Sequence, residues 1–434
     1  MSDFLEIAFA AVSNRLCLFT GTGFSKAVTN NTAPSWQGLL EEICNLCSNP
    51  KEIKDSLFPA SGKNPLSLDE AAQVLEIELL KLNKNIHIEI ANLIKKIKLE
   101  GDNSKISSFL QSHSFRVITT NYDKLIEELT GSEKCQSLTP GLPIPRSSSD
   151  VKVYHVHGSI DSPNNMVVTS DDYFKFLNTD SYFSKKLSTI LHENTVVILG
   201  YSLGDTNLKT IISDYKGFSK SNFIGSNLFF VSRSKVERHI KDYYSRCYGI
   251  RVIDNITIND FFVKLNKEIP EAEKNLANSL ESIRKVLDGK HVYKNEYLKM
   301  ENSFYQIIAS VAAIGSSINN QNVVTLIESI IKEKTKFTNE RGAWEQYEHL
   351  ARWLIYLASI LEIKDTSIEI TFLDAVKRSM SNMSSTRSLG SSWHAYHAWN
   401  NRWDSLIPSN RLLINEFILK NNPSPDATSI VSKK

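Results

Sequence analysis

Two short stretches of this 434-residue chain end in side chains that can form hydrogen bonds and exchange protons. Residues 117–123 read as a β-branched strand that ends in Asn121 and Asp123. Residues 153–159 read as a second such strand, and it ends in His157. In open parallel α/β sheets, ligands bind outside the carboxyl ends of the strands. An amide, a carboxylate and an imidazole at that edge could bind hydroxyl groups and accept a proton, and together they form a candidate active site.

A glycine-rich turn follows another predicted strand, at residues 15–20. Glycine permits positive φ and lets backbone N–H groups approach a pyrophosphate, but a tight strand-to-helix turn needs the same glycines without any ligand. Lys26 stands where the full dinucleotide fingerprint has its third glycine, and no Gly-Lys-Ser/Thr of a P-loop follows. The candidate cofactor-binding residues of this turn are Gly21, Thr22, Gly23, Phe24 and Ser25.

A further strand, at residues 195–199, ends in Gly-Tyr-Ser and is soon followed by an acid. Gly200, Ser202 and Asp205 are candidate residues here, because an acid after a Rossmann-type strand can accept hydrogen bonds from ribose hydroxyls. Asp205 could equally be an acid at a helix N-terminus, where the helix dipole favours it. The same stretch also spells the Gly-x-Ser-x-Gly nucleophile elbow of serine hydrolases, but only His239 among the downstream histidines falls within the α/β region.

Short β-branched runs alternate with longer helical patterns over the first part of the chain, which is typical of a parallel sheet. The sequence therefore predicts an α/β fold with a Rossmann-like parallel sheet, which would bring the candidate residues to one edge. The predicted strands are residues 15–20, 115–119, 152–155, 195–199, 228–232 and 251–253.

The pattern changes near residue 270. Beyond it, apolar residues recur at three and four positions, as on amphipathic helices. We therefore predict an α/β domain over residues 1–270 and an all-α C-terminal domain, for assembly or sensing, over residues 271–434. The predicted helices of the second domain are residues 271–288, 295–314, 322–334, 341–361, 368–380 and 392–400.

Composition argues against several classes of protein. The formal net charge is only +2 and the charges are well mixed, so nucleic acid and membrane surfaces are not indicated as main partners. The N-terminal residues carry acids rather than the basic region of a signal peptide, and no apolar run approaches membrane-spanning length, so a cytoplasmic location is expected.

Five scattered cysteines do not form a disulfide framework. Cys44 and Cys47 make a lone CxxC, which favours buried small residues over half a zinc site.

Taken together, the strand-end motifs make residues 10–260 resemble the sirtuin superfamily. The motifs are the glycine-rich turn, Thr-Asn-Tyr-Asp, His-x-His-Gly and Gly-x-Ser-x-x-Asp, in that order. They are similar to the Gly-Ala-Gly-Ile-Ser, Asn-Ile-Asp, His-Gly and Gly-Thr-Ser sequences of that superfamily. The first and last of these hold NAD, and the His-Gly supplies the catalytic histidine.

By this resemblance, Asn121 and His157 are the catalytic residues. Asn121 and Asp123 would lie around the nicotinamide ribose, and His157 would act on a ribose hydroxyl or on the attacking nucleophile. The turn at Gly200 would hold the phosphate–ribose portion of the cofactor. His155 faces the other side of its strand and is expected to be structural.

Two departures from the sirtuin pattern separate this chain from the protein deacylases. Residues 158–246 contain no cysteine, whereas deacylases carry a four-cysteine zinc module after the His-Gly, so no zinc is expected. Residues 33–36, Ala-Pro-Ser-Trp, stand roughly where those enzymes have Pro-Asp-Phe-Arg. The chain looks instead like the bacterial sirtuin-like domains of anti-phage defence proteins, which hydrolyse NAD to nicotinamide and ADP-ribose. The resemblance implies NAD⁺ as substrate and NAD depletion in abortive infection as the role.

Other interpretations stay open for each residue and for the function. Asn121 could close an Asx turn, His157 could be a core histidine, and Asp123 could cap a helix at residues 124–129. The competing functions are a module that senses NAD or ADP-ribose, a protein ADP-ribosyltransferase and a deacylase.

The helical region holds the densest aromatic cluster, at residues 393–403. Aromatic residues at helical spacing are usually core. His394 and His397 could share a metal, but no acid or cysteine stands beside them at ligand spacing, so core or interface is favoured. The resemblance implies a homo-oligomer, with a HerA-type ATPase ring as a possible partner. A phage-derived activator is the other partner that the helical region could sense.

Overall fold

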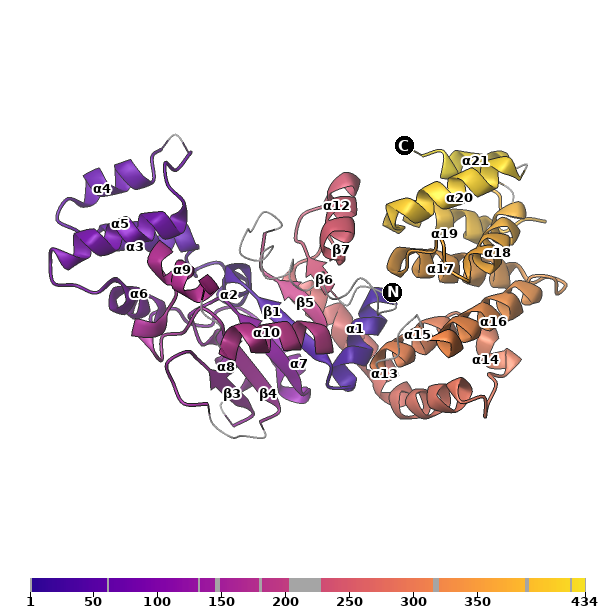
Figure 1. The fold of residues 1–434 in the computed structure, drawn as a ribbon, viewed down its shortest axis with the longest axis horizontal. Coiled ribbons are helices and arrows are strands. Elements are labelled where there is room, and N and C mark those ends of the chain that lie inside the picture. The colour runs from indigo at the N-terminus through magenta and orange to yellow at the C-terminus, as the bar shows by residue number, and fades with distance from the viewer. Residues whose placement is uncertain are drawn as a thin grey trace.

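The computed structural model describes residues 2–60, 62–131, 133–144, 149–178, 182–202, 228–314, 320–386, 390–421 and 424–433. Three regions follow one another along the long axis of the molecule (Figure 1). Helices from residues 36–94 form one end, a sheet with its covering helices lies in the middle, and helices from residues 295–431 form the other end.

The strands are β1 Leu16–Thr20, β2 Phe115–Thr119, β3 Cys135–Leu138, β4 Val151–His155, β5 Thr195–Leu199, β6 Leu228–Val231 and β7 Ile250–Ile253. Among the described residues they form one parallel sheet with the order β3-β4-β2-β1-β5-β6-β7. The predicted parallel sheet is confirmed, and each predicted strand lies within one residue of its expected bounds. The sequence pattern misses β3, because this edge strand reads Cys-Gln-Ser-Leu and has no β-branched residue.

Both faces of the sheet are buried, as is usual for parallel sheets. In β1, Leu16 and Leu18 belong to one core and Cys17 and Phe19 to the other, because side chains alternate along a strand. The first face packs on α1 Ser2–Val12, α7 Ser104–Ser112, α8 Leu125–Thr130 and α13 Ile258–Leu287, and the second on α10 Tyr182–Glu193 and α12 Arg238–Tyr248.

The strand order reverses at β1, which has β2 on one side and β5 on the other. Such a switch point opens a crevice at the carboxyl ends of the strands. Thr20 pairs with Thr119 of β2 and with Leu199 of β5, and Thr119 pairs in turn with His155 of β4. The residues that follow these four strand ends therefore meet at one edge.

A small helical unit is inserted between β1 and β2 and has a core of its own. Side-chain caps mark its helix starts: Ser35 caps α3, and Ser67 forms a reciprocal capping box with Glu70 at α5. Cys44 and Cys47 are buried in this core, as the sequence predicts. Its helices are α3 Trp36–Cys44, α4 Pro50–Leu57, α5 Leu68–Leu80 and α6 Ile86–Ile94, and the later segments η1 Pro163–Asn165 and α9 Ser170–Asn178 pack on α6 and α5. Helix α2 Thr22–Val28, which directly follows β1, belongs instead to the core of the first sheet face through Phe24 and Val28.

Helix α13 begins before the proposed domain boundary and runs through Pro270. Its first part packs under the sheet through Phe261 and Phe262, and it also contacts the helices that follow. The division of the chain at residue 270 stays a prediction, whereas the helical character of the C-terminal region is confirmed. The described helices there are α14 Asn295–Lys299, α15 Ser303–Ala313, α16 Gln321–Phe337, α17 Trp344–Ile360, α18 Glu369–Ser381, α19 Trp393–Arg402, η2 Trp403–Ser405, α20 Pro408–Lys420 and α21 Pro425–Val431.

The single helix predicted over residues 295–314 is wrong, because α14 and α15 are separate. The buried ammonium of Lys334 donates to the carbonyl oxygens of Leu298 and Lys299 at 2.9 and 3.0 Å and to Oε1 of Gln346 at 2.9 Å. The last carbonyl groups of a helix need donors from elsewhere. Lys334, which is distant in sequence, therefore stabilises a helix end that the local sequence does not mark.

A buried arginine joins the sheet to the N-terminal helix and to the C-terminal helices. Arg251 of β7 donates to Oε1 of Glu6 at 2.6 Å and to Oδ1 of Asp3 at 3.4 Å. Its guanidinium lies 4.0 Å from the centre of the Phe229 ring. The hydroxyl of Tyr356 on α17 donates to the other Glu6 oxygen at 2.9 Å. This cluster therefore links three parts of the chain that are far apart in sequence.

We expect Arg251→Met to lower the free energy of unfolding by about 3–5 kcal/mol, because a half-buried carboxylate is left without its charged partner. Lys285→Met is the matched control. Lys285 forms an exposed pair with Glu281 at 2.6 Å, and its loss should cost less than about 1 kcal/mol. Urea unfolding followed by circular dichroism measures both variants. Equal urea midpoints for the two variants would contradict the proposed contribution of the Arg251 cluster to stability.

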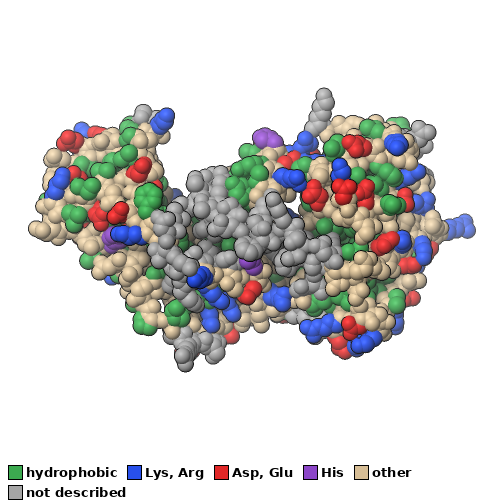
Figure 2. Space-filling model, in the orientation of Figure 1, with side chains coloured by type: hydrophobic (Ala, Val, Ile, Leu, Met, Phe, Trp, Pro, Cys, Tyr) green, Lys and Arg blue, Asp and Glu red, His purple; other side chains and the backbone are tan. Residues whose placement is uncertain are grey.

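Acidic and basic side chains are interspersed over the visible face of the C-terminal helices (Figure 2). This surface agrees with the small net charge of the chain. Within the described part of the chain, no helix is both long enough and apolar enough to cross a membrane.

The C-terminal aromatic cluster is partly core and partly surface. Trp399 and Trp403 are fully buried, whereas Trp393 is 41% exposed and its ring centre lies 3.8 Å from that of His397. Over the residues that the structure describes, no group of three or more His, Cys, Asp or Glu side chains is arranged to hold a metal ion.

Candidate active site

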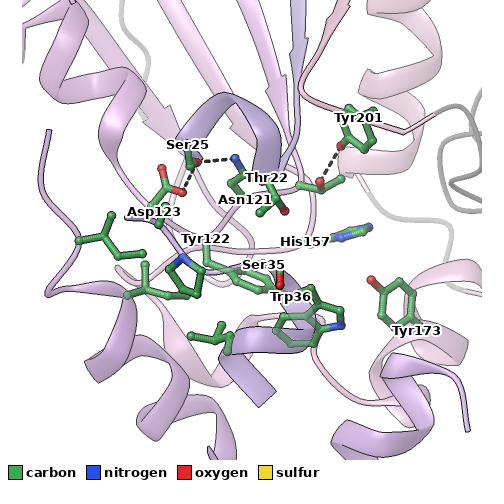
Figure 3. Close-up of a pocket in the computed structure, with 16 residues that line it drawn as sticks. Thr22, Ser25, Ser35, Trp36, Asn121, Tyr122, Asp123, His157, Tyr173 and Tyr201 are labelled. Atoms are coloured by element: carbon green, nitrogen blue, oxygen red, sulfur yellow. Dashed lines mark hydrogen bonds between the residues drawn. The ribbon is translucent and has the colours of Figure 1, made fainter. Parts of the chain in front are cut away.

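A cavity of about 160 Å³ opens at the carboxyl edge of the sheet, between the strand ends and the inserted helices (Figure 3). The side chains of Ser25, Asn121 and Asp123 gather on one side of it, and the rings of Tyr122 and Trp36 lie below them in this view. The full lining is Thr22, Ser25, Ala33, Pro34, Ser35, Trp36, Leu39, Ile94, Ile97, Thr120, Asn121, Tyr122, Asp123, His157, Tyr173 and Tyr201.

The structure brings five of the sequence-predicted residues together in this lining: Thr22, Ser25, Asn121, Asp123 and His157. They come from α2, which follows β1, and from the turns after β2 and β4, so the register of the sheet explains why they meet. The other predicted residues that can be placed do not line the cavity: Gly21, Gly23, Phe24 and Gly200 pack beside it, and Ser202 is exposed. Asp205 lies outside the described residues.

The turns after β1 and β5 pack so closely against each other that each needs glycine at the contact. The amide of Gly23 donates to the Gly200 carbonyl at 2.8 Å, and the amide of Gly21 donates to Leu199 at 3.0 Å. A Cβ on Gly200, whose φ is +75°, would lie 2.1 Å from the Phe24 nitrogen. The turns after β1 and β5 can touch only because both lack side chains there. The amide groups of Gly21 and Gly23 are thus occupied inside the protein, which favours the structural role for these two glycines.

Ser25 connects the two polar residues of the turn after β2. Its hydroxyl accepts a hydrogen bond from Nδ2 of Asn121 at 2.8 Å and donates to Oδ2 of Asp123 at 2.7 Å. Since Ser25 must accept from the amide nitrogen, the orientation of the Asn121 side chain is determined. Among the described residues, the Asn121 amide oxygen has no partner, so it can accept a hydrogen bond from a ligand.

Asp123 serves two local purposes. Its Oδ2 accepts from Ser25, and its Oδ1 accepts from the backbone amide of Leu125 at 3.2 Å, in the first turn of α8. Burial raises the pKa of Asp123, and the hydrogen bond from Ser25 opposes this shift. The N-cap of α8 is Lys124 rather than Asp123, so the expected cap is wrong, but Asp123 binds the first amide of the helix and also lines the cavity.

His157 is 4% exposed and points into the cavity from the turn after β4 (Figure 3). Its ring packs edge-on against Tyr173 and Phe176, with ring centres 5.3 and 5.2 Å apart. Burial lowers the pKa of His157 to about 4, so the imidazole is neutral at physiological pH. Tyr173 and Phe176 thus take the place of water around the imidazole. Among the described residues, the backbone carbonyl of His157 accepts from Val167 at 2.8 Å, but its imidazole has no hydrogen-bond partner.

Sequence reasoning did not assign the aromatic wall of the cavity. The ring of Trp36 meets that of Tyr122 edge-on at 5.9 Å, and the Tyr122 hydroxyl donates to the carbonyl of Val167 at 2.5 Å. The hydroxyl of Tyr201 lies 2.5 Å from that of Thr120. The Ala-Pro-Ser-Trp sequence did stand out as a departure from the sirtuin pattern, and the structure places all four residues on the cavity.

The fold and cavity define a Rossmann-like α/β protein with a ligand site at the carboxyl edge of its sheet. Residues 116–253 match the family model of the SIR2-like domain. This stretch is less than half of the chain, runs from β2 to β7, and includes Asn121, Asp123 and His157.

The chain is also similar to three named proteins. Defense-associated sirtuin 2 of Bacillus subtilis is 24% identical over 262 residues, which cover 59% of this chain and 24% of that protein. NAD(+) hydrolase ThsA of Enterococcus faecium is 26% identical over 283 residues, which cover 58% of this chain and 56% of that protein. ThsA of Bacillus cereus strain MSX-D12 is 34% identical over 117 residues, which cover 26% of this chain and 24% of that protein. The chain thus spans about a quarter to about half of the length of these relatives.

Proposed function

We propose that this chain is an NAD⁺ hydrolase that cleaves the bond between nicotinamide and ribose and releases nicotinamide and ADP-ribose. The observation that carries the proposal is the meeting of Asn121, Asp123 and His157 in one cavity, within the stretch that matches the SIR2-like domain. Two of the relatives are named NAD(+) hydrolases, which supports the same chemistry.

The chemistry of this bond suits the side chains of the cavity. The nicotinamide of NAD⁺ is a cationic leaving group that departs neutral, so no general acid is needed, unlike in ordinary glycoside hydrolysis. The site must orient the ribose, stabilise an oxocarbenium-like centre and supply a nucleophile. The free amide oxygen of Asn121 can accept a hydrogen bond from the attacking water or from a ribose hydroxyl. A negative charge on Asp123 would stabilise the positive ribosyl centre.

The low pKa of His157 fits the same reaction. A neutral imidazole can accept a hydrogen bond from a ribose hydroxyl or from the attacking water, whereas an imidazolium would repel the oxocarbenium-like centre. The rings of Trp36 and Tyr122 offer an apolar aromatic wall against which the nicotinamide ring could pack.

Incubating the purified chain with NAD⁺ tests the proposal. We expect nicotinamide and ADP-ribose to accumulate in equal amounts, as separated by liquid chromatography. ADP-ribose attached to protein would indicate a transferase instead. Release of nicotinamide only with an acylated peptide would indicate a deacylase. Unchanged NAD⁺ that binds the chain would indicate a sensing module.

The pH dependence of the reaction should report the burial of His157. We expect kcat/KM to stay flat from pH 8 to about 5 and to fall only as the pH drops through about 4, where the imidazole becomes protonated. Nicotinamide release across this range measures the profile, and intrinsic fluorescence at each pH checks that the chain is folded. A half-maximal rate near pH 6.5 would show that His157 is not desolvated in solution.

We further propose that this activity depletes NAD⁺ in abortive anti-phage defence, because one relative is named a defence-associated sirtuin. Homo-oligomerisation, a HerA-type ATPase ring as partner and a phage-derived activator stay predictions. Gel filtration of the chain alone and mixed with such an ATPase tests the assembly, and a monomer that ignores the ATPase would contradict it.

A further inference from the structure

His155 is completely buried at the end of β4, on the strand face that carries Val151 and Val153, and it does not line the cavity. Its Nδ1 lies 3.0 Å from the backbone carbonyl oxygen of Asn121, and its Nε2 lies 2.8 Å from Oε1 of Glu127. A carbonyl oxygen can only accept a hydrogen bond, and so can an ionised carboxylate. His155 thus joins the Asn121 carbonyl, on the side of Nδ1, to the Glu127 carboxylate, on the side of Nε2.

The carboxylate of Glu127 is held in its ionised form. Burial alone would raise the pKa of Glu127, but His155 and Lys124 together lower it to about 2. The ammonium of Lys124 lies 2.9 Å from Oε1 of Glu127 and 2.6 Å from Oδ2 of Asp161, and it also donates to the hydroxyl of Ser137. A chain of polar contacts thus runs from the buried His155 through Glu127 and Lys124 to the partly exposed Asp161.

The same imidazole acts on the proposed catalytic turn. Residues 120–123 have no regular secondary structure, and two backbone hydrogen bonds hold them, from Thr120 to the Thr20 carbonyl at 3.4 Å and from Ile160 to the Tyr122 carbonyl at 3.0 Å. Side-chain contacts add to these two bonds. Ser25 holds the turn from the cavity side through the Asn121 amide, and His155 holds it from behind through the Asn121 carbonyl. The positive charge of His155 also lowers the pKa of Asp123, against the effect of burial.

We propose that His155 is a positioning residue, which places the Asn121 amide in the cavity by binding the Asn121 carbonyl and which is itself held by Glu127. This inference rests on the proposed NAD⁺ hydrolysis, because positioning is measured as a rate. An error of about 1 Å in the placement of a reacting group can cost about a hundredfold in rate. The geometry therefore predicts a large effect from a residue that does not touch the substrate.

Three variants of the full chain separate positioning from general stability. His155→Leu removes both hydrogen bonds, and His155→Asn keeps a donor at the place of Nδ1 and hence the bond to the Asn121 carbonyl. His113→Leu is the matched control, because Nδ1 of His113 also lies 3.1 Å from a backbone carbonyl oxygen, that of Phe109 on α7, and away from the cavity.

We expect His155→Leu to lower kcat about a hundredfold with nearly unchanged KM for NAD⁺, His155→Asn to recover most of this loss, and His113→Leu to keep wild-type kcat. If His155→Leu does not fold, the double variant His155→Leu/Glu127→Leu replaces it. This variant leaves Lys124 paired with Asp161, and we expect the same hundredfold loss of kcat with nearly unchanged KM. Wild-type kcat in the leucine variant, or equal loss in the leucine and asparagine variants, would overturn the proposal.

Hydrogen exchange at the backbone amides of residues 120–123 measures how firmly this turn is held, independently of activity. We expect faster exchange in His155→Leu than in the wild type and near wild-type exchange in His155→Asn. If the wild-type chain releases no nicotinamide, the proposed function fails, and exchange alone then decides the positioning role. Unchanged exchange in the leucine variant would overturn it.

Discussion

Replacing Asn121 with alanine is expected to slow nicotinamide release from NAD⁺ about a thousandfold, because the side chain that orients water and ribose is lost. The effect should fall on kcat, since the aromatic wall of the cavity is untouched. Ser25 keeps its hydrogen bond to Asp123 at 2.7 Å, so the turn should keep its shape and the variant should fold. Single-turnover nicotinamide release measures the chemical step directly.

The control for this variant is Asn266→Ala. Asn266 lies on α13, donates to the carbonyl of Lys105 at 2.9 Å, and does not line the cavity. This variant should keep wild-type activity, and both variants should show the circular dichroism and melting temperature of a folded chain. Full activity in folded Asn121→Ala would remove Asn121 from the proposed mechanism.

Replacing His157 is expected to lower kcat about a hundred- to ten-thousandfold, the usual range for the loss of a group that accepts a proton or orients the nucleophile. The choice of replacement matters, because the imidazole also fills space between Tyr173 and Phe176. His157→Phe preserves the packing and loses the ring nitrogens. His157→Gln preserves a polar group and loses the ability to accept a full proton.

The two His157 variants therefore separate packing from chemistry. We expect both to be folded and both to be inactive, as measured by nicotinamide release and thermal melting. His349→Phe is the matched control, since His349 is also buried but binds the carbonyl of Lys299 in the helical region. It should lower the melting temperature and keep the rate. Substantial activity in His157→Phe would mean that the histidine only fills the wall.

Local patterns were sufficient to predict the sheet. Short apolar runs of about five residues predict strands because a parallel strand buried on both faces carries its whole signal within the run itself. Parallel strands end at the same edge, so polar residues placed just after them, such as Asn121 and His157, could be expected to meet without knowledge of the tertiary structure. The edge strand β3 and the break after Lys299 carry no such local signal, and both were missed.

The sequence by itself thus determined the parallel sheet, the helical C-terminal region and the group of residues at the strand ends, because each depends on spacing along the chain. Only the tertiary structure decided the protonation and the orientation of those side chains. The neutral imidazole of His157 depends on Tyr173 and Phe176, and the orientation of Asn121 depends on Ser25. Burial and hydrogen bonding are set by neighbours that are distant in sequence, so no local pattern records them.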